Sequence, residues 1–137
     1  MDESMAEQIK VMIVEDDLLL SIVEEKMVSR LGYDVVCTAT SGEETLRKIR
    51  DFNPHILLID VNLAGEINGI ETVEKLQNSH FGVPTIFLSG DNSTESLNYA
   101  SSVDYVDFLL KPVKSNDLAC SLEKAAGMEL HKAQNAA

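Results

Sequence analysis

Basic side chains are scarce in this chain, and that scarcity argues against two kinds of partner. Among 137 residues, 11 are Lys or Arg and 23 are Asp or Glu, so the formal net charge is -12. A surface of this sign repels nucleic-acid phosphates and anionic lipid headgroups. We therefore expect no direct binding of nucleic acid or membranes, whereas cation binding is favoured.

Long apolar runs are also missing. Runs such as Val11 to Val14 and Ile56 to Ile59 are far shorter than the roughly 20 residues that a membrane-spanning helix needs. Asp2 and Glu3 stand where a secretory signal carries positive charge. These features predict a cytoplasmic protein.

Cysteine pairs and glycine-rich nucleotide motifs are absent as well. Cys37 and Cys120 lie far apart without C-x-x-C spacing, which favours buried apolar thiols over a bridge or a metal site. Gly65 and Gly69 belong to no G-x-G-x-x-G motif or P-loop, so nucleotide binding has no support.

The composition that remains, 45% hydrophobic and 25% charged, is typical of one globular domain. We expect a core over about residues 9–127, with terminal extensions at 1–8 and 128–137. Five short apolar or β-branched segments predict strands. These are Lys10 to Val14, Asp34 to Ala39, Ile56 to Ile59, Thr85 to Ser89 and Asp107 to Leu110.

Segments with helical spacing lie between the strands. The first helix is expected to bury one apolar face, consisting of Leu20, Val23, Met27, Val28 and Leu31. Gly32 is placed to end this helix in a left-handed conformation, and Ser41 to Glu44 predicts a capping box. A fourth helix around Ser93 to Ala100 has few apolar anchors and is the weakest element.

Alternating strands and helices predict an α/β fold, a three-layer doubly wound five-stranded parallel sheet with five helices. In such sheets, ligands bind beyond the carboxyl ends of the strands. At the carboxyl ends of four of the predicted strands stand polar residues that could bind a ligand or take part in catalysis. They are Glu15, Asp16 and Asp17 after the first strand, Asp60 after the third, Ser89 after the fourth and Lys111 after the fifth.

Crowded carboxylates repel one another unless a cation joins them, and Mg²⁺ prefers such hard oxygen ligands, with Mn²⁺ as an alternative. Asp60 is the candidate nucleophile toward phosphorus, with the Lys111 ammonium neutralising developing charge and Ser89 donating a hydrogen bond. Asp17 is expected to serve only the first turn of the following helix.

The residues at these strand ends resemble the response-regulator receiver family of two-component signalling, over nearly the whole chain. The motifs are Val14-Glu15-Asp16-Asp17, Leu58-Ile59-Asp60, Phe87-Leu88-Ser89-Gly90 and Leu109-Leu110-Lys111-Pro112. The resemblance implies the flavodoxin-like fold of chemotaxis regulators, with strand order 2-1-3-4-5. It also implies a cis peptide before Pro112.

For the site, the resemblance implies Asp60 as the phosphoacceptor and Asp16 as a direct metal ligand. Glu15 would act on the metal through water, and Asn62 through its backbone carbonyl. Ser89 would read the phosphoryl group, and Phe108 is similar to the aromatic switch position. Side chains at Asn62 and Asp91 correspond to positions that tune hydrolysis of the acyl phosphate.

Two departures from the family pattern stand out. The loop from Leu63 to Gly69 lacks the usual proline and is one residue longer than the commonest form, which leaves its conformation open. Asp104 and Tyr105 replace the frequent Gly-Ala pair, and Phe108 lacks the hydroxyl of the commoner tyrosine.

The function expected is that of a phosphoacceptor receiver domain, not an enzyme in the usual sense. A histidine kinase or phosphotransfer protein would be the donor, and a downstream protein would read the changed surface, where the weak fourth helix is the candidate two-state element. A weak homodimer is compatible with this function. Little chain follows Pro112, so output is expected through a partner, unless the chain is a fragment of a longer regulator or hybrid kinase.

Three alternatives stand beside this interpretation. A receiver-like interaction module that works without phosphorylation is expected to have lost part of the acid, Asp60 or Lys111 set. A flavodoxin needs a phosphate-binding loop after the first strand, where Glu15 to Asp17 would repel FMN. A haloacid-dehalogenase-like phosphatase carries a second Asp where this chain has Asn62.

Overall fold

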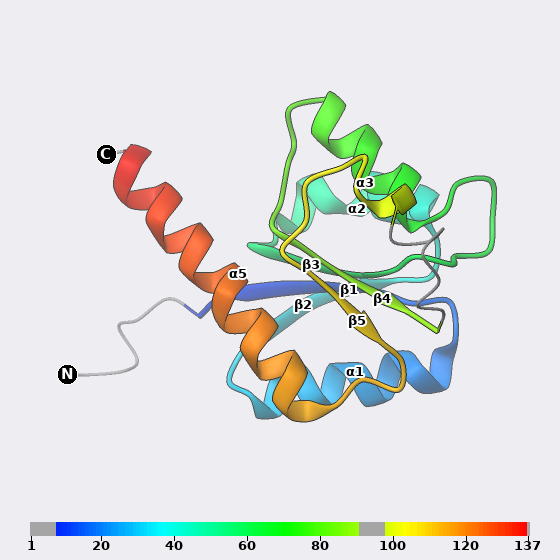
Figure 1. Ribbon diagram of the computed structural model, residues 1–137, viewed down its shortest axis with the longest axis horizontal. Helices are drawn as coiled ribbons and strands as arrows, with labels where there is room; N and C mark the ends of the chain where they lie inside the picture. Colours follow the sequence, from blue (N-terminus) through cyan, green and yellow to red (C-terminus); the bar gives the residue numbers. More distant parts are fainter. Residues whose placement is uncertain (1–7, 91–97, 137) are drawn as a thin grey trace.

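A computed structural model of the chain describes residues 8–90 and 98–136. Five parallel strands form one sheet in the order β2-β1-β3-β4-β5, as the family resemblance implied (Figure 1). The strands are β1 Lys10–Val14, β2 Asp34–Ala39, β3 Ile56–Asp60, β4 Thr85–Ser89 and β5 Asp107–Leu110. The strand predictions are confirmed, except that β3 continues through Asp60 itself.

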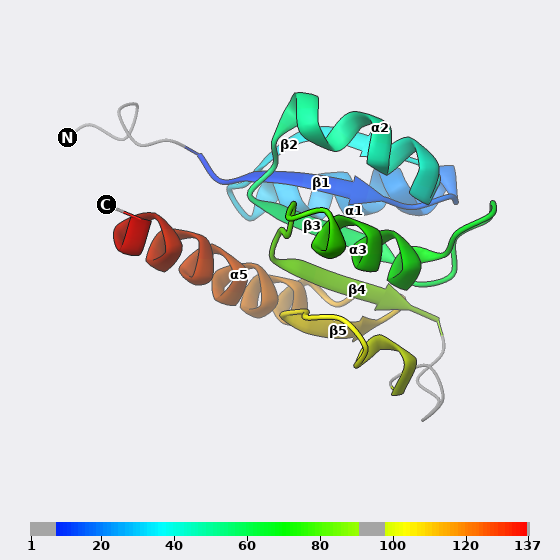
Figure 2. The ribbon, with the colours of Figure 1, turned by 90° about the horizontal axis from the view of Figure 1, so that it is seen from above.

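Helices cover both faces of the sheet. They are α1 Leu18–Arg30, α2 Gly42–Phe52, α3 Gly69–Asn78 and α5 Ser115–Ala136. Figure 1 shows α2 and α3 on one side of the sheet and α1 on the other, and Figure 2 shows α5 beside β4 and β5. Of the expected fourth helix, Asn98 to Ala100 are helical, and the rest of its range lies outside the described residues. Among the described helices, none is both long and apolar enough to cross a bilayer.

The central strands are buried because helices pack against both of their faces. All five residues of β3 and all five of β4 are buried, as their unbroken apolar character indicates. One core cluster joins the sheet to α2 and α3, and includes Met12 and Ile70. The other joins it to α1 and α5, and includes Ile13 and Leu118. These two layers hold the strand ends in fixed positions.

The local signals at the helix ends are partly confirmed. Gly32 has φ +98°, the left-handed conformation expected after α1. Ser41 Oγ accepts from the Glu44 backbone N–H at 3.1 Å, as predicted, but Glu44 Oε1 accepts from Thr40 N instead of Ser41 N. The capping box predicted there is therefore incomplete. A complete one lies at Asn68 and Glu71 of α3.

The buried face of α1 differs from the prediction. Val28 is buried, but Val23 is 50% exposed, and Glu24 is only 3% exposed. Glu24 and Val28 are four residues apart, so they lie on the same face of the helix, toward the sheet. The apolar residues of α1 are distributed around all sides of the helix, so their spacing alone could not identify the side that faces the sheet.

Candidate functional site

The carboxyl ends of β1, β3, β4 and β5 bring the expected residues to one edge of the sheet. The strand register places Val14 beside Ile59 and Asp60 beside Leu88, so Glu15, just after β1, and Asp60, the last residue of β3, lie at the ends of neighbouring strands. Lys111 N donates to Ser89 O at 2.8 Å, which extends the pairing of β4 and β5 by one hydrogen bond. The sheet itself therefore aligns four strand ends on the site.

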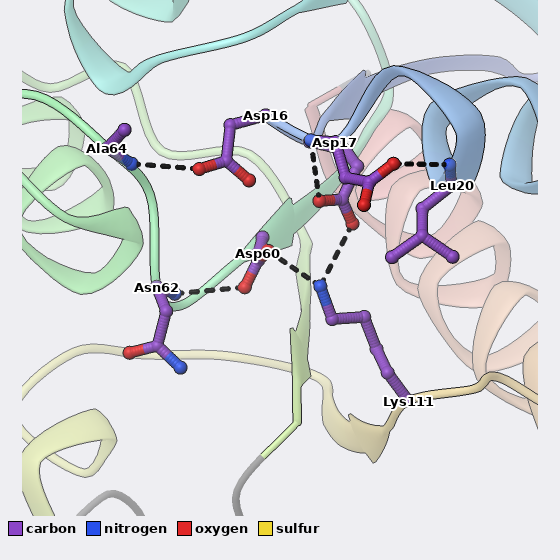
Figure 3. A network of polar contacts seen from close by, with 8 residues as sticks. Asp16, Asp17, Leu20, Asp60, Asn62, Ala64 and Lys111 are labelled. Carbon is purple, nitrogen blue, oxygen red and sulfur yellow. Dashed lines mark hydrogen bonds and ion pairs between the residues drawn. The ribbon is translucent and has the colours of Figure 1, made fainter.

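Lys111 joins two of the acids (Figure 3). Its Nζ lies 2.7 Å from Asp60 Oδ2 and 3.1 Å from Glu15 Oε1, and the lysine side chain is 17% exposed. Burial lowers the pKa of Lys111, but the hydrogen bonds and negative charges of Asp60 and Glu15 outweigh it, so the net shift is upward. The ammonium group therefore stays charged in the site.

Three carboxylates cluster around this lysine. Oxygen atoms of Glu15, Asp16 and Asp60 all lie within 4.8 Å of one another. Glu15 and Asp60 are buried, whereas Asp16 is exposed. Three carboxylates against one ammonium leave an excess of negative charge, which a divalent cation can neutralise. The donor set is all oxygen and partly open to solvent, which fits a hard cation that keeps several waters.

Asp60 is held by backbone as well as by Lys111. Asn62 N donates to Asp60 Oδ1 at 2.9 Å, so each oxygen of the Asp60 carboxylate has a partner. Behind the acid, Gly69 approaches so closely that a Cβ there would collide with the Asp60 carbonyl oxygen. Ala64 N donates to Asp16 Oδ2 at 3.1 Å. The loop after β3 is therefore packed around the acid cluster.

Glu24 is a neighbour of the site that the motifs did not indicate. Burial, followed by the hydrogen bond and negative charge of Glu15, raises the pKa of Glu24 to about 9. Burial also raises the pKa of Glu15, and the Asp60 charge adds to this, although hydrogen bonds from Glu24, Asp17 and Lys111 oppose it. Glu24 is the group that holds a proton near neutral pH. The one sequence signal was its four-residue spacing from Leu20 and Val28.

The two expected switch residues occupy neighbouring strands. Ser89 is the buried last residue of β4, and Phe108 is a half-buried residue of β5 that pairs with Phe87. The ring centroid of Phe108 lies 6.3 Å from that of Phe87 and 6.4 Å from that of Tyr105. Phe108 therefore belongs to an aromatic cluster three positions before Lys111.

Two further expectations have clear outcomes. The peptide bond between Lys111 and Pro112 is cis, as the resemblance implied. Asp17 caps α1, since its Oδ1 accepts from Leu20 N at 3.1 Å, in agreement with a local helical role. Asp91 lies outside the described residues.

Comparison with known proteins places this chain in a family. The model of the response regulator receiver domain matches residues 11–123. The chain is 28% identical over 119 residues to the transcriptional regulatory protein ZraR of Escherichia coli K12, covering 87% of this chain and 26% of that protein. It is also 28% identical over 116 residues to the probable C4-dicarboxylate response regulator DctR of Bacillus subtilis, covering 84% of this chain and 51% of that protein.

Solved structures agree with the sequence matches. The signal receiver domain of a modulated diguanylate cyclase from Desulfovibrio desulfuricans G20 is 32% identical, with a TM-score of 0.83 and coverage of 92% of this chain and 99% of that chain. The chain thus spans between about a quarter and a half of the two curated relatives, but nearly all of an isolated receiver domain. This protein belongs to the family of response regulator receiver domains.

Proposed function

We propose that the domain accepts a phosphoryl group on Asp60 from a histidine kinase or a phosphotransfer protein. The observation that carries the proposal is the contact of Lys111 Nζ with Asp60 Oδ2 at 2.7 Å, inside the cluster of Glu15, Asp16 and Asp60. A strand-end carboxylate beside a fixed ammonium and further acids is suited to phosphoryl transfer, since the catalytic need is positioning and charge neutralisation.

In the transfer, a carboxylate oxygen of Asp60 forms a bond to phosphorus while the bond from phosphorus to the donor nitrogen breaks. The electron pair of the broken bond returns to that nitrogen. Lys111, already beside Asp60, neutralises the phosphoryl oxygens as they arrive, and the Ser89 hydroxyl donates a hydrogen bond to one of them. The domain promotes its own modification, whereas turnover of other substrates is not part of this function.

Asp16 would hold Mg²⁺ or Mn²⁺ directly, together with the Asp60 carboxylate and the Asn62 backbone carbonyl, and Glu15 would act through water. Bound there, the cation supplies positive charge to the transferring phosphoryl oxygens. The fit rests on the three mutually close carboxylates, of which only Asp16 is exposed.

The output would be a changed surface. Ser89 would respond to the phosphoryl group and Phe108 would carry the change outward through the aromatic cluster, to be read by a downstream protein. The chain covers only 26% and 51% of the two curated relatives, so the output activity of those longer proteins is not assigned to this domain.

Two further predictions stay untested. They are a weak homodimer and a domain core over about residues 9–127.

The test is intact-mass measurement after incubation with acetyl phosphate and Mg²⁺. Wild type should gain the mass of one phosphoryl group, whereas Asp60→Asn should gain none. Asp104→Asn is the matched control, because Asp104 is exposed and lies at the opposite end of β5, just before it. A folded wild-type protein that gains no mass would favour the interaction module that works without phosphorylation.

A further inference from the structure

The loop between β3 and α3 donates hydrogen bonds from every second backbone N–H group to three carboxylates. Its backbone N–H groups at Asn62, Ala64 and Glu66 each donate to a different acid. The acceptors are Asp60 Oδ1 at 2.9 Å, Asp16 Oδ2 at 3.1 Å and Glu43 Oε2 at 2.9 Å, respectively. Two of these acids belong to the site described above. The third, Glu43, lies in the first turn of α2, outside the acid cluster.

The contact with Glu43 is close on both carboxylate oxygens. Gly65 has φ +113°, and a Cβ there would come within 3.0 Å of Glu43 Oε1 and 3.4 Å of Oε2. Oε1 is enclosed by protein atoms, although the residue as a whole is only half-buried. The loop therefore lies directly on this carboxylate, and the left-handed glycine is what permits the approach.

The Glu43 carboxylate is suited to this role because it is ionised. Backbone N–H groups of Glu43, Glu66 and Ile67 lower its pKa, with a smaller contribution from the charge of Arg47. An ionised carboxylate forms stronger hydrogen bonds to backbone amides than a neutral acceptor does. The loop thus has a strong anchor at its far end.

This loop needs an anchor for a reason already visible in the sequence. From Leu63 to Gly69 it contains no proline, so no pyrrolidine ring fixes a φ angle in the loop. The loop also carries Asn62 and contacts Asp16, the residues expected to bind the cation. Movement of the loop would therefore displace the residues that are expected to bind the cation.

We propose that Glu43 is a positioning residue for the metal site, acting through the loop backbone on Asn62 and Asp16. The inference rests on the proposed function, because it assigns Glu43 to the same cation site. Glu43 touches neither the cation nor the phosphoryl group. Loss of such an outer support typically weakens metal binding by about 10-fold to 100-fold.

The experiment compares Glu43→Ala with Glu43→Gln and Glu44→Ala. Glu44 is the matched control: it is the neighbouring acid of the same helix turn, but it bonds Thr40 and Lys48 instead of the loop. Mn²⁺ binding is measured by electron paramagnetic resonance, and the initial rate with acetyl phosphate is measured as a function of Mg²⁺ concentration. Thermal unfolding in EDTA reports the folding of each variant.

Glu43→Ala should raise the Mn²⁺ dissociation constant and the half-saturating Mg²⁺ concentration about tenfold, with the rate at saturating Mg²⁺ nearly unchanged. Glu43→Gln keeps one oxygen acceptor and should recover part of the affinity, and Glu44→Ala should leave both values at the wild-type level. Unchanged affinities in Glu43→Ala, or an equal loss in Glu44→Ala, would overturn the proposal. Failure of phosphorylation in wild type would refute the proposed function. The Mn²⁺ dissociation constants of the variants would still test whether Glu43 supports the metal site.

Discussion

Lys111 and Asp60 form an ion pair across the ends of two strands that are not neighbours in the sheet. Their atoms Nζ and Oδ2 lie 2.7 Å apart, although β4 separates β3 from β5. The long lysine side chain spans the end of β4, and the Asp60 carboxylate is almost completely buried. The lysine therefore stabilises a buried charge, and in the proposed reaction the same ammonium group would contact the phosphoryl oxygens.

Replacing Lys111 should affect both stability and reaction. Lys111→Met leaves Asp60 and Glu15 without their cation, and removal of one partner from a buried pair costs about 3–5 kcal/mol. Phosphorylation by acetyl phosphate should slow by about a hundredfold, because a preorganised positive group is lost. Chemical denaturation in EDTA and intact-mass kinetics check the two effects. A rate equal to wild type would remove Lys111 from the reaction.

The stability of the metal-free protein should depend on pH through Glu24. Its pKa is about 9 in the folded protein against a reference value of 4.5, so the folded state retains a proton that the unfolded state loses. The contribution is fully present below about pH 4.5 and is lost as pH rises toward 9, by at most about 1.4 kcal/mol per pH unit.

Glu24→Gln is the variant that checks this dependence. Denaturation in EDTA from pH 5 to pH 9 should show a smaller fall in the unfolding free energy than wild type, because glutamine does not ionise. Glu25→Gln is the control, since Glu25 is exposed on the same helix. Parallel curves for Glu24→Gln and wild type would mean that Glu24 does not hold the proton.

Cation binding should stabilise the fold through the acid cluster. Mg²⁺ is expected to raise the melting temperature of wild type, because it neutralises the repulsion among Glu15, Asp16 and Asp60. Asp16→Ala should abolish that increase. Asp17→Ala should lower stability by about 1 kcal/mol through loss of the helix cap, yet keep the response to Mg²⁺. Differential scanning fluorimetry with and without Mg²⁺ separates the two acids.

Gly69 should be intolerant of any side chain. Gly69→Ala places a methyl group against the Asp60 carbonyl oxygen and should destabilise the protein by about 1–3 kcal/mol. Gly127→Ala in α5 meets no atom within 4 Å and should stabilise the helix by about 0.5–1 kcal/mol. Urea denaturation of both variants tests the pair, and equal effects would contradict the close approach at Gly69.

The strands and the acids at their ends were predictable because two simple rules act together. Buried parallel strands read as short apolar runs, and their carboxyl ends meet at one edge, so Asp16, Asp60 and Lys111 could be assigned to a common site without coordinates. The strand order came from the family resemblance instead, since periodicity does not say which strands are neighbours.

Glu24 and Glu43 could not be assigned in that way. Both lie on helices, where an acid is most often a solvated residue, and their importance depends on which neighbours the tertiary packing supplies. The apolar residues of α1 point in several directions, so no hydrophobic pattern in the sequence indicated that Glu24 faces the sheet. The contact of Glu43 with the loop depends on a left-handed Gly65, which the sequence permits but does not require.

The aromatic cluster of Phe87, Tyr105 and Phe108 constrains how motion can spread from the site. Phe87 is completely enclosed, whereas Tyr105 is 36% exposed, and Phe108 contacts both rings. Close-packed interiors leave little spare volume, so Phe87 offers no room for a displaced neighbour. A movement of Phe108 toward Tyr105 therefore meets a ring that is itself partly open to solvent, so a rearrangement inside the cluster would alter the molecular surface at Tyr105.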